Sequence, residues 1–382
     1  MIQKLITSSI GIIFSLSATV WAGDDIHVGT YTYKDRSVYY GDLRSGRPYG
    51  YGECEYNDGS HYEGNFVKGK RQGYGSFHGT DKTSYFGDWY NNLMQGHGVY
   101  YYPNNNRYEG SLKENLRSGK GTMKYYNGDT YAGAWNMDQR VGEGTYTWAN
   151  GSKYEGQWLN DTKTGYGTLY WSDGSSYTGE WVNDFRQGRG TYIYTNGDKY
   201  EGEWSKGVQN GEGIYTFSSG EKYSGSYILG QRTGHGVYTF PNGDKYEGNF
   251  KNGRREGHGI FEWSNGTRYE GEWHNSMRHG KGSYKASNGS SYVGNWSNNK
   301  PNGRGKMVMA DGTLYEGQFK NGQWDGKGTI LSTDGKKFIG TFVQGVKEGD
   351  FKEYDKQNKL IRIGLFKHGH IVSQKSQEEL TQ

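Results

Sequence analysis

Residues 242–266 read NGDKYEGNFKNGRREGHGIFEWSNG, and the Asn-Gly pair that ends this stretch is the pair that begins it. The pattern recurs along most of the 382-residue chain. If the Tyr of Tyr-x-Gly is repeat position 0, that position returns every 23 residues without insertion, at Tyr39, Tyr62, Tyr85, Tyr108, Tyr131, Tyr154, Tyr177, Tyr200, Tyr223, Tyr246, Tyr269, Tyr292, Tyr315 and Phe338. A fixed period of this length indicates stacked copies of one supersecondary unit.

The composition excludes an ordinary globular protein. Only 31% of the residues are hydrophobic, and aromatic residues supply much of that share, whereas glycine reaches 65 residues. Several aliphatic cores cannot be built from this material. The glycines lack the triplet period of collagen, and the aromatic residues are too abundant for disorder. The 45 basic and 41 acidic residues are spread evenly, so the charge does not indicate nucleic acid. The single cysteine, Cys54, excludes an internal disulfide and is expected to fill a strand position.

Each unit is expected to form two strands. Around position 0 a basic residue, Tyr, often Glu, Gly, a polar residue and an aromatic residue follow one another, and this alternation is typical of a strand. Positions 11 to 17 alternate again, beginning with Gly-x-Gly, and a glycine at position 20 usually follows Asn or Asp. That glycine indicates a hairpin turn, so the chain is expected to be one antiparallel meander. Only Lys82 and Asn105 replace the turn glycine in the early units.

The register follows from the turn. A three-residue loop that ends in the left-handed glycine keeps the charged position −1 away from the aromatic position 17. Position 0 is then opposite position 15, position 2 opposite 13, and position 4 opposite 11 on both sides. Trp158, for example, is expected between Gly142 and Gly165. The bare glycine backbone gives each large ring a surface to cover.

The two ends of the chain differ from the array. Residues 1–22 have Lys4 near the start, an apolar run, and Val20 and Ala22 at the −3 and −1 positions of a cleavage site. This pattern predicts a secretory signal peptide and an extracytoplasmic, periplasmic or secreted protein; an uncleaved membrane anchor is the alternative. Residues 23–38 are expected to form an N-terminal half repeat or cap, residues 39–360 the repeat array, and residues 361–382 a degenerate last repeat with a polar tail.

The repeat resembles the MORN repeat, whose name refers to membrane occupation and recognition. The resemblance rests on YEGNFKNGRREGHGIFEWSNG and its copies. It implies an all-β fold: an elongated, single-layer, twisted antiparallel β-meander of about 14–15 tandem 23-residue hairpin repeats. It also implies a scaffold or a membrane-associated protein. In some relatives the array precedes a lipid kinase or methyltransferase domain, for which this chain leaves no room.

No catalytic, cofactor-binding or metal-binding residues are predicted. Gly-x-Gly recurs as part of the repeat and is followed by no helix, so it does not indicate a phosphate loop. Glu155 and its equivalents at position 1 follow a basic residue such as Lys153 by two positions, which predicts a solvated charge ladder. His235 and His258 share position 12 but would lie about 9.5 Å apart, too far to ligate one metal ion. An enzyme is therefore not expected.

The ring-bearing face is the candidate binding surface, because a single-layer sheet leaves it without a covering layer. The rings either only cover glycines or also line a groove that binds a protein partner or membrane lipid. A glycan stacked on the rings is the alternative ligand, nucleic acid is not expected, and pairing of strand edges or ends would give homo-oligomers. The candidate groove residues are Tyr154, Trp158, Tyr177, Trp181, Tyr200, Trp204, Tyr215, Tyr246, Phe250, Tyr269 and Trp273.

Overall fold

The computed structural model describes residues 25–376 and residue 379. All regular elements of this part are β-strands, 31 in number, and within each of the two compact units described below, neighbouring strands in the chain pair antiparallel. The expected all-β meander of hairpin repeats is confirmed. The predicted signal peptide at residues 1–22 lies outside the described residues. The strands fall into two compact units, which divide between Ala149 and Asn150.

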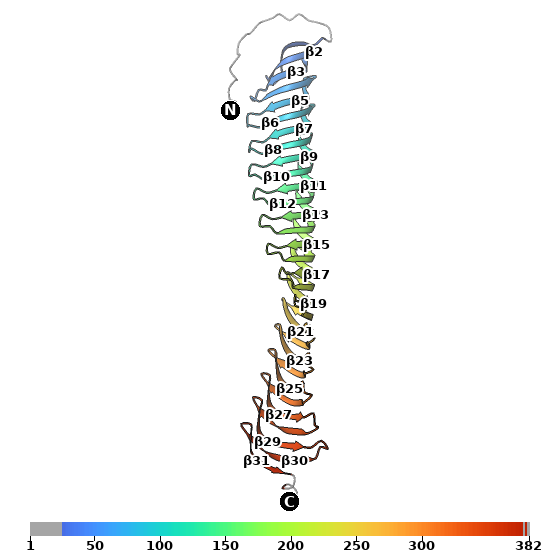
Figure 1. Cartoon of the computed structure of the whole chain (residues 1–382). Helices are drawn as coiled ribbons and strands as arrows, with labels where there is room; N and C mark the ends of the chain where they lie inside the picture. The colour runs from blue at the N-terminus through green and yellow to red at the C-terminus, as the bar shows by residue number, and fades with distance from the viewer. Residues whose placement is uncertain (1–24, 377–378, 380–382) are drawn as a thin grey trace, which may run out of the picture. The chain divides into compact units, whose positions relative to one another are not determined.

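The first compact unit ends at Ala149 and contains the eleven strands that lie between residues 27 and 147 (Figure 1). Its strands follow one another in chain order, and Cys54 is buried opposite Tyr39 and Tyr62, as expected of a small strand residue. The strands are β1 (His27–Thr32), β2 (Val38–Arg44), β3 (Arg47–Glu55), β4 (His61–Val67), β5 (Lys70–His78), β6 (Ser84–Tyr90), β7 (Leu93–Tyr101), β8 (Arg107–Lys113), β9 (Leu116–Lys124), β10 (Thr130–Asn136) and β11 (Gln139–Thr147).

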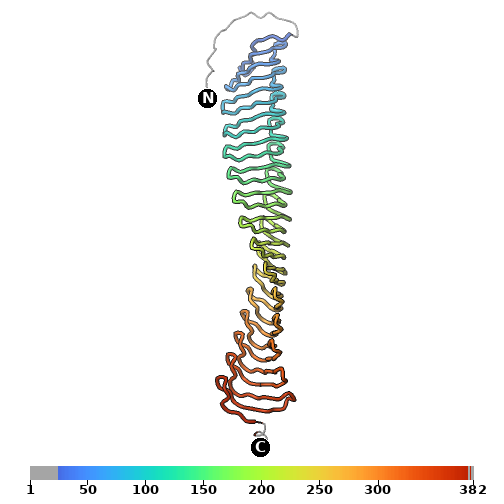
Figure 2. Tube along the Cα trace, viewed as in Figure 1, coloured from blue at the N-terminus to red at the C-terminus, as the bar shows by residue number. Residues whose placement is uncertain are grey.

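In the second compact unit, strands of seven and nine residues alternate from residue 153 to residue 354, and two strands of eight and seven residues follow. Figure 2 shows its trace reversing at one edge and then at the other. Its strands are β12 (Lys153–Leu159), β13 (Thr162–Tyr170), β14 (Ser176–Val182), β15 (Phe185–Ile193), β16 (Lys199–Ser205), β17 (Val208–Thr216), β18 (Lys222–Ile228), β19 (Gln231–Thr239), β20 (Lys245–Lys251), β21 (Arg254–Glu262), β22 (Arg268–His274), β23 (Met277–Lys285), β24 (Ser291–Ser297), β25 (Lys300–Val308), β26 (Leu314–Lys320), β27 (Gln323–Leu331), β28 (Lys337–Val343), β29 (Val346–Tyr354), β30 (Leu360–Lys367) and β31 (His370–Ser376).

The turn at position 20 has the predicted form. Between β13 and β14, Trp171 donates its backbone N–H to Ser175, and Gly174 donates back to Trp171, both at 3.0 Å. Gly174 has a φ of +90°, the left-handed conformation that a three-residue loop of this kind requires. Lys82 and Asn105 take the same conformation, with φ of 75° and 66°, so the two units without the glycine keep the turn.

The register between repeats is also as predicted. In the pairing of β13 with β14, Leu169 is opposite Tyr177, and Gly165 is opposite Trp181. Positions 15 and 11 of one repeat therefore face positions 0 and 4 of the next. Paired residues of adjacent strands point to the same face, so the rings of successive repeats gather on one face.

The register within a repeat differs from the expectation. Trp158 is opposite Lys163 and not Gly165, because the pairing of β12 with β13 shifts after the central glycines. The cause is a two-residue turn at Asn160 and Asp161, whose φ values of 47° and 66° are both positive. That tight turn leaves two extra residues on the second strand, and Gly165, with a φ of +57°, takes up the bulge.

The rings at position 0 are the core of the fold. Tyr154 is 0% exposed and lies along its own strand, with its hydroxyl donating to the carbonyl of Gln157 at 3.1 Å. A Cβ on Gly167 would lie 2.4 Å from that hydroxyl oxygen, and a Cβ on Gly156 would lie 2.5 Å from the Cα of Gly167. The glycines at positions 2 and 13 are thus required by close approach of two backbones and a ring.

The position 4 ring of the following repeat closes this core. Trp181 meets Tyr154 edge to face, with ring centroids 5.5 Å apart, and its indole N–H donates to the carbonyl of Gly167 at 3.1 Å. Edge-to-face pairs of this kind contribute about 0.5–1.5 kcal/mol beyond their buried area. A single hairpin lacks this contact, so each repeat depends on the next.

A methyl group at the central glycine should test this core. We expect Gly156→Ala to destabilise the protein by about 1–3 kcal/mol in urea unfolding, because the new Cβ meets backbone that cannot move aside. Glu155→Ala changes the neighbouring exposed residue and should stay within about 0.5 kcal/mol. Equal effects of the two substitutions would contradict the close approach.

The buried tyrosines should make the fold sensitive to alkali. Burial raises the pKa of Tyr223, Tyr292 and Tyr315 to about 12, above the value near 10 expected in the unfolded chain. A raised folded-state pKa means that the stabilisation is complete below pH 10 and is lost as the pH rises from 10 through 12. Circular dichroism should show a constant stability from pH 7 to 9 and a steep fall above 10; a fall that begins below pH 9 would contradict this account.

Candidate functional site

The structure buries most of the candidate groove residues. Ten of them are at most 5% exposed: Tyr154, Trp158, Tyr177, Trp181, Tyr200, Trp204, Tyr246, Phe250, Tyr269 and Trp273. Only Tyr215 is half-buried. The expectation that these ten rings line an open groove is corrected, because the position 0 ring lies against the glycines and the next position 4 ring covers it.

A second set of rings supplies the accessible part of this face. They occupy positions 15 and 17, and each contacts the next, from 4.5 Å between the centroids of Tyr192 and Tyr194 to 6.1 Å between those of Trp263 and Tyr284. We call this set the aromatic row: Trp171, Tyr192, Tyr194, Tyr215, Phe217, Tyr238, Phe240, Phe261, Trp263 and Tyr284. All are half-buried except Phe261, which is buried.

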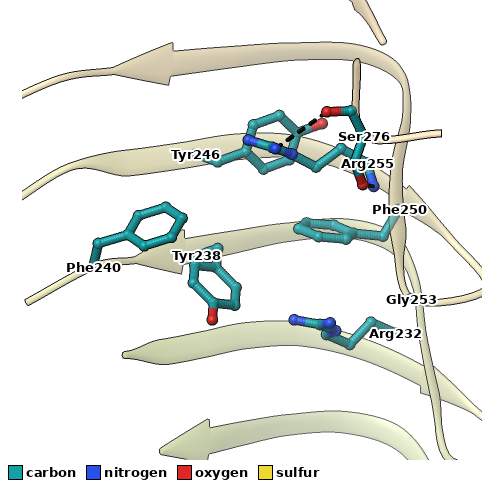
Figure 3. A pocket seen from close by; sticks show the side chains of 8 residues that line it. All are labelled: Arg232, Tyr238, Phe240, Tyr246, Phe250, Gly253, Arg255 and Ser276. Carbon is teal, nitrogen blue, oxygen red and sulfur yellow. Dashed lines mark hydrogen bonds between the residues drawn. The ribbon is translucent and has the colours of Figure 1, made fainter. Parts of the chain in front are cut away.

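Beside the row stands a line of arginines at position 9, which the sequence analysis missed. The guanidinium of Arg255 lies 4.4 Å from the ring centroid of Trp273 and 5.4 Å from that of Tyr246, and its Nη2 donates to the backbone carbonyl of Ser276 at 3.2 Å. Figure 3 shows this bond and the neighbouring Arg232. Arg186 and Arg278 make the same bond to the turn of the next repeat. We call Arg186, Arg232, Arg255 and Arg278 the arginine row.

The arginine row carries charge that no carboxylate balances locally. Within the described residues, the ion pairs of this unit use other cations, such as Lys245 and Arg268, and none of the four row arginines. Burial lowers the pKa of Arg186, Arg255 and Arg278 below the usual guanidinium value. A guanidinium stays protonated at neutral pH all the same, so the row presents fixed positive charge among rings.

Carboxylates lie at the other edge of the aromatic row. Asp198, at repeat position 21, accepts hydrogen bonds from the hydroxyl of Tyr215 at 2.7 Å and from the backbone N–H of Ser218 at 2.8 Å. The bond from the backbone of Ser218 lowers the pKa of Asp198. The face therefore runs from a negative edge at the three-residue turns, across the rings, to the arginine row.

The opposite face has the predicted charge ladder. Lys153 pairs with Glu155 at 2.8 Å, and Lys245 pairs with Glu247 at 2.7 Å. The charges of these pairs neutralise one another. Across the described ranges, no cluster of three or more His, Cys, Asp or Glu side chains could hold a metal ion.

A hollow of about 220 Å³ opens where the two rows meet (Figure 3). Arg232 and Arg255 lie on one side of it, and Tyr238 and Phe240 of the aromatic row lie on the other. Tyr246 and Phe250 also contribute to its lining. This arrangement offers guanidinium donors and ring surface side by side.

The family model of the MORN repeat matches thirteen consecutive segments of 23 residues, from 39–61 to 315–337. The chain belongs to the MORN repeat family. The family is in general a non-catalytic scaffold for protein or membrane association. In the MORN repeats of this chain, the Tyr at position 0 is buried against the central glycines, and the arginine row adds charge to one face.

Other comparisons add little on function. The search of curated proteins finds no match to the chain. Among solved structures, the TCP10 domain of Danio rerio CPAP bound to a STIL peptide is 13% identical, with a TM-score of 0.31 over 60% of this chain and 98% of that one. The TCP domain of Drosophila melanogaster SAS-4 bound to a proline-rich motif of Ana2 is 16% identical, with a TM-score of 0.27 over 41% and 85%. Scores this low support no argument. No helix in the described part of the chain is long and apolar enough to span a membrane.

The arginine row should contribute to stability as well as to charge. We expect Arg255→Ala to destabilise the MORN array by about 1–2 kcal/mol, because it removes a ring contact and the bond to the carbonyl of Ser276. Arg254→Ala, at the exposed neighbouring residue, should stay within about 0.5 kcal/mol. Urea unfolding measures both, and an effect of Arg255→Ala no larger than its control would contradict the stacked geometry.

Proposed function

We propose that this chain is a non-enzymatic, extracytoplasmic MORN scaffold that binds a protein partner through the aromatic row and the arginine row. The extracytoplasmic location rests on the sequence of residues 1–22 alone. Binding at this face rests on one observation: half-buried rings and guanidinium groups without carboxylate partners lie side by side in successive repeats.

A protein segment suits these groups better than a lipid surface does. The guanidinium of Arg255 is held against rings and against the carbonyl of Ser276, so its remaining donors have a fixed direction. Fixed donors favour backbone carbonyls and carboxylates at defined positions. A membrane instead attracts many freely exposed cations, whereas Lys153, Lys199 and Lys245 of the opposite face are each paired with a glutamate.

A glycan is the second candidate, and the carboxylates beside the rings favour it. Asp198 is fixed by two hydrogen bonds at the edge of the aromatic row, and the Asp244 carboxylate accepts one from the backbone N–H of Ser264. Rings beside fixed polar groups can stack on sugars and bind their hydroxyls. The positive charge of the arginine row is the feature that this candidate leaves unused.

The test combines three ligands with two variants. Peptides are selected from a random displayed library on the chain, and their affinities are then measured for a row variant, Phe217→Ser with Phe240→Ser, and for a control variant, Tyr166→Ser, on the exposed opposite face. We expect the row variant to weaken peptide binding by about tenfold or more, since interface rings are frequent hot spots, and the control to leave it unchanged.

Cosedimentation with anionic liposomes at low and high salt, and retention on peptidoglycan, are measured in parallel. Salt-sensitive liposome binding that survives the row variant, in a chain that selects no peptide, would replace the proposal with a peripheral membrane scaffold. Peptidoglycan retention that the row variant abolishes would favour the glycan candidate.

A further inference from the structure

The spacing of the arginine row restricts the shape of the ligand. Arg232, Arg255 and Arg278 occupy position 9 of three consecutive repeats, on β19, β21 and β23, and intervening strands pair with each neighbour in turn. Adjacent strands lie about 4.7–4.9 Å apart, so equivalent groups two strands apart recur about every 9.5 Å. A ligand that crosses the strands from repeat to repeat meets the same guanidinium and the same rings at this interval.

Only one regular backbone conformation has a matching period. A β-strand presents the same side about every 6.7 Å. An α-helix returns to the same side after seven residues, about 10.5 Å. A polyproline II helix returns after three residues, about 9.3 Å. The polyproline II period differs from the repeat spacing by a few tenths of an ångström, whereas the helix period differs by about 1 Å and the strand period by about 2.8 Å per repeat.

The chemistry of the face agrees with this conformation. A polyproline II segment makes no internal hydrogen bonds, so its carbonyls are free to accept from guanidinium groups. Proline rings dock against aromatic surface such as that of Tyr238 and Phe240. The row arginines have no carboxylate partner among the described residues, which makes an acidic side chain their complement.

We infer that Arg232, Arg255 and Arg278 bind a polyproline II segment of a partner protein that carries an acidic residue at every third position. The inference rests on the proposed function and adds to it the conformation and sequence period of the ligand. One acidic side chain reaches each guanidinium, and the two residues between successive acids, best as proline, lie against the aromatic row.

The deciding experiment compares two peptides of equal composition. One consists of five Glu-Pro-Pro triplets, and the other has the same residues with the glutamates irregularly spaced. Titration calorimetry on the full chain at physiological salt should show the regular peptide binding at least about tenfold more tightly, because only it places a charge-assisted bond in every repeat. Equal affinities of the two peptides, or binding of neither, would overturn the inference.

Two variants locate the site. Arg255→Gln should weaken the regular peptide about tenfold, whereas Arg268→Gln, which removes a cation from the opposite face, should leave it unchanged. Equal losses from both would mean unspecific attraction by charge and would overturn the inference.

Arg255→Gln could weaken binding by disturbing the fold, so a further variant is designed to increase the affinity. Gln209 occupies position 9 in the repeat between Arg186 and Arg232, where its amide donates to the hydroxyl of Tyr194 at 3.0 Å. Gln209→Arg should complete the row and tighten the regular peptide by several fold, and no gain would count against the periodic site. If the row variant of the library test abolishes binding of the selected peptides while the regular and the irregular peptide bind equally, the protein-binding function stands and the polyproline II period fails.

Discussion

The close packing of one tyrosine ring on two glycines is the constraint on which the rest of the fold depends. In the repeat that begins at Tyr246, the ring lies where a Cβ of Gly259 would be, 2.4 Å from the tyrosine hydroxyl oxygen. The two central backbones approach so closely that a Cβ on Gly248 would lie 2.4 Å from the Cα of Gly259. The two glycines therefore form the surface against which the core ring packs, and their role is close packing and not flexibility.

This packing explains why the unit must repeat. The ring of Tyr246 is covered by Trp273 of the next repeat, at a centroid distance of 5.3 Å, and Arg255 stacks on the same tryptophan while bonding to the turn beyond it. Each core is completed by its successor, so stability passes from neighbour to neighbour. Because the Tyr at position 0 fills the space over the glycines, the rings at positions 15 and 17 remain half-buried at its side. The accessible face is thus a consequence of how the core is closed.

The sequence predicts the parts of this arrangement that local patterns determine. The period, the alternation, the left-handed glycine exemplified by Gly174 and the ion pairs of the opposite face all follow from residues close in the chain. The bulge at Gly165 follows from the two-residue turn at Asn160 and Asp161, which carries no glycine; the hairpin signal for the same turn is present in another repeat, at Asn252 and Gly253, and was missed. The alternation of residues shows which face of the sheet a side chain is on, but it does not show how deeply that side chain is buried.

For the same reason, the sequence placed the candidate binding rings at positions 0 and 4, although most of the accessible rings lie at positions 15 and 17. The Tyr and Trp residues at positions 0 and 4 have the most regular pattern, and regularity marks the core here, whereas the more variable positions 15 and 17 are accessible. The role of Arg255 depends on Trp273, eighteen residues later, and on a carbonyl of the next turn. The recurrence of Arg at position 9 is visible in the sequence, but the ring and the carbonyl that each guanidinium contacts are not.

The repeat that begins at Phe338 meets the same constraint with different residues. Here position 13 is Phe351 instead of glycine, opposite Gly340, and position 0 is Phe338, the one unit in which the tyrosine hydroxyl is missing. Elsewhere a side chain at position 13 would collide with that hydroxyl; without it, the two phenylalanine rings stack at 5.7 Å with an interplanar angle of 19°. Phe351 then packs against Phe366 at 4.6 Å. Phe351 thus replaces the position 13 glycine where the regular array ends. The end of a stack of repeats requires a different surface from its interior.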